Sequence, residues 1–412
     1  MRAVHICCTG LLIALGALGC RQENLTKTSV VSSDSAGIQL VINGADRLAL
    51  PLPVDISTNP TLIMGESDGG VGELSTIEAA SRLRDGSVVV ADGGSKRVLI
   101  FDRRGRVARV SGRPGAGPGE FLRLTFVGPY RGDSIIAYDS QQRRVSILDS
   151  GGVFRRSFLL TTGLAGDSPE RPLLLGAFAD GSVLLSSTRI PAVRAGHVRL
   201  QHLLIRANPN GTPLDTLGRF PGAEVYFGGE GERVSVAQPP FARAMLVSVR
   251  ESSVVVSDNE AFSFTAYSSN GSPERIVRVD APPRPILPAH LEVLLRRELR
   301  GVEDPALETR LRNGQRLMLT HKTLPALQAI HRDPEGIVWA AIYETPGDES
   351  RAWLVFGPDG VLLGRTTLPR GFAPTQFGGD YVLGMSETST GVPVLKVYTV
   401  SWRSSRRDAL GQ

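Results

Sequence analysis

The chain has 412 residues, with 46 Lys+Arg against 41 Asp+Glu and a formal net charge of +5 at pH 7. This length admits two domains or one large β architecture, and it is sufficient to bury a substantial core. The positive charges are almost all arginines scattered among acids, without a basic stripe interleaved with stacking aromatic residues, so we expect no nucleic-acid partner.

Residues 1–20, MRAVHICCTGLLIALGALGC, have the features of an export signal. Arg2 precedes an apolar run over about residues 6–18, which is too short to span a membrane and typical of a signal-peptide core. The run ends in ALGC, which resembles the lipobox of bacterial lipoproteins, although leucine is more usual at the position of Ala17. The resemblance implies cleavage before Cys20 and acylation of that residue. The alternative is an ordinary signal-peptidase site at the same place.

All three cysteines, Cys7, Cys8 and Cys20, lie in this leader. The mature chain therefore has no disulfide and no cysteine metal site, which fits an oxidising compartment. Residues 21–36 are polar and rich in Ser and Thr, and we interpret them as a flexible tether. Arg21 after the cysteine resembles outer-membrane sorting. We expect an exported protein that is anchored in a lipid bilayer, facing the periplasm and held by the outer membrane.

A strand pattern recurs along residues 37–402. Each copy has a β-branched strand, a polar hairpin, a second strand, a turn with a glycine and a third strand. The copies begin at residues 87, 134, 182, 253, 336 and 381. Five of the turns contain a glycine that we expect at positive φ, namely Gly105, Gly152, Gly211, Gly271 and Gly360.

The first and last copies suggest how the repeats are joined. The sixth copy lacks its last strand, and a spare strand, GIQLVINGADRLAL (37–50), precedes the first copy. We expect this N-terminal strand to complete the last sheet, because ring closure protects sheet edges that would otherwise be open. The predicted fold class is all-β, a six-bladed β-propeller over residues 37–402, followed by a basic tail at residues 403–412.

The first two copies also resemble a known family. The segment VADGGSKRVLIFD follows the pattern of the NHL repeat at Ala91, Asp92, Ser95, Arg97, Val98, Phe101 and Asp102. The chain is similar to six-bladed β-propeller lipoproteins of the bacterial cell envelope. Copies three to six keep the strand pattern and lose the Asp and the Arg. We therefore expect Asp92 and Arg97 to order the hairpin rather than to perform chemistry.

A glycine-rich stretch, GRPGAGPGEF, lies between the first two copies. A phosphate-binding loop follows a strand and opens a helix, but strand patterns flank this stretch on both sides and no GK[ST] follows. The family resemblance implies a loop that links two blades. We expect its glycines to turn the chain, its acid to bind backbone or arginine donors, and its aromatic residue to fill the gap between blades. These residues are Gly112, Gly115, Gly117, Gly119, Glu120 and Phe121.

Residues 283–325 change from a strand pattern to a helix pattern. Five leucines between residues 287 and 299 share one helix face, Pro288 suits a first turn, and Gly301 suits a stop. This insertion lies between blades four and five, and it is either decoration or a lid over the central pocket. A second insertion, 218–244, has aromatic residues that line the same mouth or fill a cleft, namely Phe220, Tyr226, Phe227 and Phe241.

Catalytic motifs are missing from the sequence. The five histidines of the mature chain have no recognisable metal-ligand spacing, and no G-x-S-x-G occurs. Glu78 is the clearest carboxylate on an inner strand, whereas a calcium site needs about six oxygens. We predict no catalytic residue and no cofactor, and a non-catalytic module that binds an envelope protein or a small ligand. The alternatives are a metal-dependent lyase or hydrolase of the lactonase-like propeller type, with a divalent metal in the channel, and a subunit of a larger envelope complex.

Overall fold

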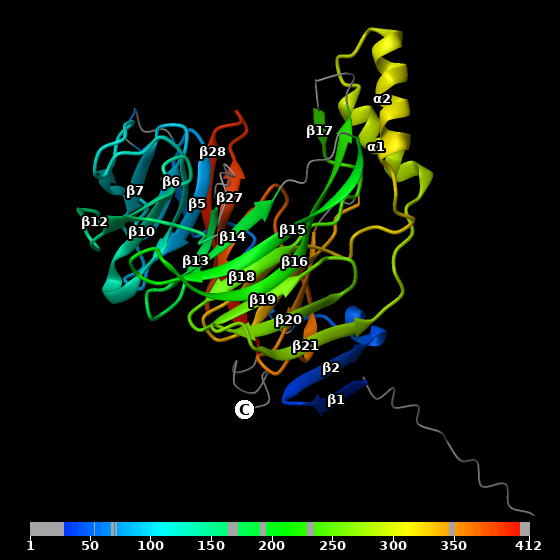
Figure 1. The fold of residues 1–412 in the computed structure, drawn as a ribbon, viewed down its shortest axis with the longest axis horizontal. Coiled ribbons are helices and arrows are strands. Elements are labelled where there is room, and N and C mark those ends of the chain that lie inside the picture. The colour runs from blue at the N-terminus through cyan, green and yellow to red at the C-terminus, as the bar shows by residue number, and fades with distance from the viewer. Residues whose placement is uncertain are drawn as a thin grey trace, which may run out of the picture.

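The computed structural model describes residues 29–403 except 53, 67–69, 71, 164–171, 190–194, 229–234 and 346–350. The predicted leader with Cys20, most of the predicted tether and residues 404–412 of the tail lie outside the described residues. Within the described part, the chain is mostly β structure in six sheets, and two helices stand at one end of the molecule (Figure 1).

The first three sheets follow the chain order. The first is β5 (Ile77–Arg82), β6 (Val88–Asp92), β7 (Arg97–Phe101) and β8 (Val107–Ser111). The second is β9 (Leu124–Pro129), β10 (Ile135–Asp139), β11 (Arg144–Leu148) and β12 (Phe154–Leu159), with the 3-10 helix η2 (Arg131–Asp133) between β9 and β10. The third is β13 (Leu173–Ala177), β14 (Val183–Arg189), β15 (Gly196–Ala207), β16 (Pro213–Gly228) and β17 (Ser235–Ala237).

The last three sheets recruit strands from the N-terminal segment. The fourth contains β18 (Leu246–Arg250), β19 (Ser253–Ser257), β20 (Ser263–Ser268) and β21 (Pro273–Asp280), extended by β2 (Ile38–Gly44) and β1 (Val30–Ser35). The fifth is β22 (Leu327–Arg332), β23 (Val338–Ile342), β24 (Ala352–Phe356) and β25 (Leu362–Thr367). The sixth is β26 (Ala373–Phe377), β27 (Tyr381–Glu387) and β28 (Pro393–Trp402), with β3 (Val54–Ile56) and β4 (Leu62–Met64) paired to β28.

The strand predicted to complete the last sheet was placed wrongly. Residues 37–50 were expected there, but β2 pairs in parallel with β21 at the outer edge of the fourth sheet. The structural reason is specific. Buried Asn43 accepts a hydrogen bond from Leu362 N (2.7 Å) and donates one to Gly360 O (3.1 Å), so β2 ties the fourth sheet to the fifth. β28 is paired instead by β3 and β4, which lie further along the chain.

The sheets pack against one another through separate hydrophobic clusters. The cluster containing Val89 and Ile135 joins the first and second sheets, and the cluster containing Phe264 and Phe356 joins the fourth and fifth. A further cluster contains Val90 of the first sheet and Leu383 of the sixth. We call β5, β9, β13, β18, β22 and β26 the first strands of their sheets. They contact each other in this order, and β26 also contacts β5. Many four-stranded antiparallel sheets packed in this way define a β-propeller-type fold.

The local turn predictions are confirmed. The five turn glycines have φ angles between 77° and 90°, a region that glycine adopts without strain. Gly211 has a second reason to be glycine, because a Cβ there would overlap the carbonyl oxygen of Leu159 on the preceding sheet. A side chain at this turn would therefore separate two neighbouring sheets.

Both helices of the described residues lie between β21 and β22, in the segment expected to be helical. α1 (Pro288–Glu298) begins with a proline at its first turn, and α2 (Pro305–Met318) is capped by Asp304, whose side chain accepts a hydrogen bond from Ala306 N (2.8 Å). A 3-10 helix, η1 (Ala45–Ala49), follows β2. Neither α1 nor α2 is long and apolar enough to cross a membrane.

Candidate ligand-binding cavity

The first strand of each sheet borders a common cavity of about 980 Å³. The lining residues come from the middle and end of β5, β9, β13, β18, β22 and β26 and from the turns that follow, and Tyr381, the first residue of β27, completes the lining. A cavity of this size is large enough for a small organic molecule. The helical insertion leads into the start of β22, whereas the cavity lies toward the end of that strand. The insertion is therefore at the starts of these strands, away from the cavity.

Small side chains keep the cavity open. Ser81, Gly128, Gly176 and Ser248 line it from four different strands. Gly176 also allows two sheets to approach each other, because a Cβ there would lie 2.7 Å from the Cβ of Val249 on the next sheet. Larger residues at these positions would fill the space or push the strands apart.

Arginine dominates the charged groups of the cavity. Five arginines line it, against two acids, Glu251 and Asp380, which leaves a formal excess of three positive charges. The arginines come from four of the six strands or their turns, and they are Arg82, Arg84, Arg131, Arg250 and Arg332. Among the described residues, none of these five guanidinium groups forms an ion pair with a carboxylate. The cavity lining therefore carries an excess of positive charge that no ion pair within the described residues neutralises.

Two of these arginines are held by neutral groups. The guanidinium carbon of Arg82 lies 4.4 Å from the centre of the Tyr381 ring, a cation–π contact. Arg332 donates from Nη1 to Ser253 Oγ (2.5 Å), and its backbone N–H donates to Ser248 Oγ (2.8 Å). Because these partners carry no charge, they orient the cations without cancelling them.

Burial shifts the titration of several lining groups. It raises the pKa of the Tyr381 hydroxyl, against the opposing effect of nearby Arg250 and Arg82. It lowers the pKa of Arg332, with Glu274 acting in the opposite direction. It also lowers the pKa of His331 to about 4. His331 packs against Trp353 and Phe377, with ring centres 5.8 and 5.5 Å apart, and is therefore neutral at physiological pH.

The glycine-rich loop lies away from the cavity, between β8 and β9. Gly112, Gly115 and Gly119 have positive φ angles, whereas Gly117 does not. Glu120 accepts hydrogen bonds from Gly117 N (2.8 Å) and Arg113 Nε (2.7 Å). The bond from Gly117, followed by that from Arg113, lowers the pKa of Glu120. Arg144 donates to the carbonyl oxygens of Gly117 and Glu120, which fixes the loop to the second sheet.

Phe121 lies at the end of this loop and is 1% exposed. It belongs to the cluster that contains Ile100 of the first sheet and Leu124 and Leu148 of the second. A Cβ at Gly112 would lie 2.5 Å from the Phe121 ring, so the glycine leaves room for the aromatic side chain. The loop thus places a large apolar group between two sheets.

The aspartates at the ends of β6 and β10 order neighbouring loops. Asp92 accepts hydrogen bonds from Thr76 N (2.9 Å), ahead of β5, and from Ser95 Oγ (2.5 Å) in the next hairpin. Burial would raise the pKa of Asp92, but the hydrogen bonds from Ser75, Ser95 and Thr76 outweigh it and lower the pKa. Asp139 binds Arg123 N and Gln142 N in the same manner. Arg97 contacts Ser95 Oγ, so the expected hairpin role describes both residues of the NHL-like motif.

The structure separates the groups considered as metal ligands. Glu78 is exposed on β5 and is not part of the cavity lining. In the described part of the chain, no three His, Cys, Asp or Glu side chains are grouped as metal ligands. The histidines have separate surroundings: His290 Nδ1 accepts from Leu287 N, His202 Nδ1 contacts Ser186 Oγ, and His197, His321 and His331 lie in three further places.

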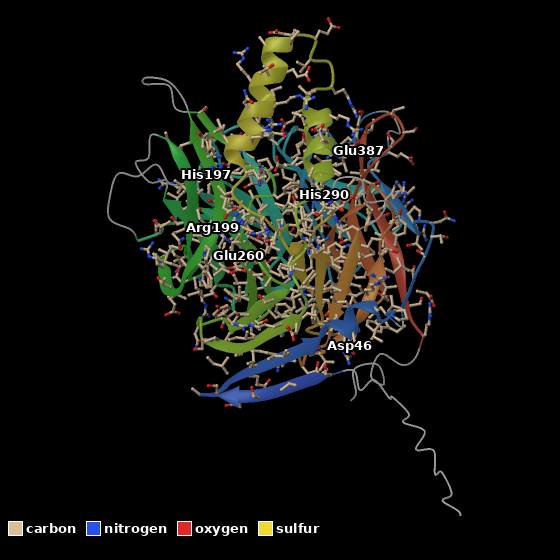
Figure 2. The ribbon with its side chains drawn as sticks, turned by 90° about the vertical axis from the view of Figure 1, so that its right-hand side faces the viewer. Asp46, His197, Arg199, Glu260, His290 and Glu387 are labelled. Atoms are coloured by element: carbon tan, nitrogen blue, oxygen red, sulfur yellow. The ribbon has the colours of Figure 1, made fainter. Side chains whose placement is uncertain are left out.

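A second polar cluster joins the helical insertion to the third sheet. Glu224 of β16 accepts hydrogen bonds from His321 Nε2 (2.8 Å) and from Arg243 N (2.7 Å). Arg199 pairs with Glu260, and Figure 2 shows these two residues close together below His197. Arg243 also donates to Thr323 O (2.9 Å). These contacts hold the insertion against the third sheet.

Sequence reasoning missed the cavity arginines. Arg82, Arg131, Arg250 and Arg332 lie at or just beyond the ends of their strands, but the chain contains many arginines and nothing in the pattern distinguishes these. What these arginines share is their position in the repeat, because each lies at or just beyond the end of a first strand. That signal can be found only after the repeats are aligned in space.

The fold and the cavity define a β-propeller-type protein with a positively charged central cavity. Among solved structures, a member of the DUF4221 family from Bacteroides vulgatus has a TM-score of 0.50 at 12% identity, over 84% of this chain and 98% of that chain. An exported-protein candidate from Bacteroides fragilis has a TM-score of 0.47 at 10% identity, over 89% of this chain and 100% of that chain. A gluconolactonase from Xanthomonas campestris has a TM-score of 0.41 at 14% identity, over 86% and 98%.

At these identities, the likeness of the Bacteroides vulgatus protein bears on the fold alone. No family model matches the chain, and a search of curated proteins found no significant match. The function must therefore be reasoned from the cavity.

Proposed function

We propose that this chain is a non-catalytic, exported and lipid-anchored β-propeller that binds a ligand in its central cavity. The observation that carries the proposal is the cavity of about 980 Å³, which residues from all six first strands line. Cavities at the centre of a scaffold, lined by apolar surface and a few oriented polar groups, are typical ligand sites.

The proposal includes six blades closed into a ring. It is supported by the shared hydrophobic cluster of the first and sixth sheets and by the pairing of β3 and β4 with β28. Closure of this kind removes open sheet edges. In this ring, the loop with Glu120 and Phe121 has a structural role as the link between two blades.

The proposed location follows from residues 1–20. A short apolar core followed by ALGC favours export and acylation of Cys20, which makes a lipid bilayer the partner of the mature N-terminus. Arg21 after the cysteine favours the outer membrane, with the propeller in the periplasm. The polar tether would then separate the folded part from the bilayer.

The chemistry of the lining favours binding over catalysis. Its arginines are held by a tyrosine ring and serine hydroxyls, and its imidazole, His331, packs between aromatic rings. These groups can orient a ligand through hydrogen bonds and charge. A general base, by contrast, needs a pKa near the working pH, and burial moves the pKa of His331 to about 4.

The test is native mass spectrometry of the full chain, extracted in mild detergent from the membranes of the cells that make it. We expect the wild type to retain a small molecule, and the cavity-filling variants Ser81→Trp and Ala179→Trp to lose it. Ser33→Trp, on the exposed strand β1, is the matched control. Circular dichroism and melting temperature establish that each variant is folded.

Two outcomes would contradict the proposal. Equal retention of the small molecule by wild type and by both folded cavity variants would place its binding elsewhere. A stoichiometric divalent metal, found by elemental analysis of the purified chain, would favour the metal-dependent lyase or hydrolase instead.

A further inference from the structure

We infer that the arginine-rich end of the cavity binds a small molecule that carries an oxyanion group, such as a phosphate or a carboxylate. The inference rests on the proposed function because it concerns the same cavity. It goes further by naming the chemical class of the ligand and the residues that would recognise it.

The first reason is charge that the protein leaves without a partner. The lining contains five arginines and two acids, and none of the five forms an ion pair within the described residues. Guanidinium groups with free donors favour phosphate and carboxylate oxygens, so a lining with this excess of arginine can bind an anionic ligand.

The second reason is the placement of the arginines around the cavity. Arg82 and Arg131 belong to the β5 and β9 side, whereas Arg250 and Arg332 belong to the β18 and β22 side. The first strands contact one another in chain order, so β13 lies between these two groups on one side of the cavity and β26 on the other. Arg82 and Arg250, one from each group, both lie near Tyr381, so an anion bound beside Tyr381 can reach cations from both sides of the cavity.

The third reason is the state of the individual donors. Arg332 is half-buried and donates to a serine hydroxyl, and burial lowers its pKa despite the opposing effect of Glu274, so a bound anion would stabilise its charged form. Tyr381 packs its ring against Arg82, and its hydroxyl forms no hydrogen bond within the described part of the chain. Burial keeps this hydroxyl protonated by raising its pKa, so it can donate a hydrogen bond to an anion.

The experiment is isothermal titration calorimetry on the detergent-solubilised full chain in metal-free buffer. The probes are inorganic pyrophosphate and citrate, with neutral sorbitol as the uncharged control. The variants are Arg82→Gln and Arg250→Gln, and the matched control is Arg104→Gln, an exposed arginine in the turn between β7 and β8. We expect at least one of the two anions to bind, and each cavity variant to weaken it by about tenfold, the usual effect of one charged hydrogen bond.

The outcomes are decisive in each direction. Anion binding that weakens in both cavity variants, weakens with added salt and is unchanged in Arg104→Gln supports the inference. Binding of equal strength in all four proteins, or no binding of either anion at millimolar concentration, overturns it. If the native mass spectra show a neutral molecule lost only from the cavity-filling variants, the proposed function stands and the anionic ligand class fails.

Discussion

Replacing His331 by leucine should make the free energy of unfolding fall less steeply as the pH decreases below 7. His331 packs against Trp353 and Phe377, and burial lowers its pKa from 6.5 to about 4. A histidine whose folded pKa lies below its unfolded value binds its proton more readily in the unfolded chain. Its contribution to stability is therefore complete above about pH 7 and is lost progressively as the pH falls toward 4.

The magnitude follows from the two pKa values. Between pH 7 and pH 5, proton binding by the unfolded chain should reduce the free energy of unfolding of the wild type by about 2 kcal/mol through this residue alone. The aspartates with lowered pKa, among them Asp92 and Asp139, add a further loss in the same direction at lower pH. The variant keeps the contribution of the aspartates and loses that of the histidine.

Urea unfolding at pH 7 and pH 5, followed by tryptophan fluorescence, provides the measurement. The wild type should lose about 2 kcal/mol more than His331→Leu over this interval. The same pH slope in wild type and in His331→Leu would refute the assignment of the acid sensitivity to His331.

Three further predictions concern the fold. Phe121→Ala should reduce the free energy of unfolding by about 3–5 kcal/mol, because it leaves a cavity between two sheets; chemical denaturation measures it, and a loss below 1 kcal/mol would mean that the sheets close the gap. Asn43→Leu should cost about 1–3 kcal/mol, since Leu362 N and Gly360 O lose their partner; hydrogen exchange at Leu362 should rise, and an unchanged rate would contradict the role of Asn43. Deleting residues 54–64 should abolish cooperative thermal unfolding, whereas deleting residues 29–35 should leave it nearly unchanged. Unchanged cooperativity after the first deletion would contradict the role of β3 and β4 in completing the sixth sheet.

The parts of the fold that the sequence predicts are local. The turn glycines could be recognised because a positive φ requires glycine at a single position, and the first helix could be recognised because leucines repeat at helical spacing next to a proline. The strand hairpins could be recognised for the same reason, since their strands are a few residues apart. Such features are determined by residues close to one another in the chain, so they can be predicted from the sequence.

The errors and omissions are non-local. The parallel pairing of β2 with β21 joins residues more than 230 positions apart, and the contact of Asn43 with Leu362 spans 319 positions. The apolar pattern of β2 fits an edge of either sheet, and the observed edge is fixed by distant polar contacts such as those of Asn43 with Leu362 and of Gln39 with Arg275. The cavity also depends on residues that are far apart in the chain, because Arg82 and Arg250 come close to Tyr381 only after three sheets have assembled.

The fading of the NHL-like motif after the second copy has a structural explanation. Asp92 orders the loop that precedes β5 by accepting hydrogen bonds from Ser75 and Thr76. In the fourth sheet, Asn259 follows β19 and accepts a hydrogen bond from Ala244 N (3.1 Å), in the loop that enters β18. An amide oxygen thus performs in one sheet what a carboxylate performs in another. Because only an acceptor at that place is required, the architecture can persist where the recognisable residues are replaced, and the resemblance in sequence ends before the resemblance in structure does.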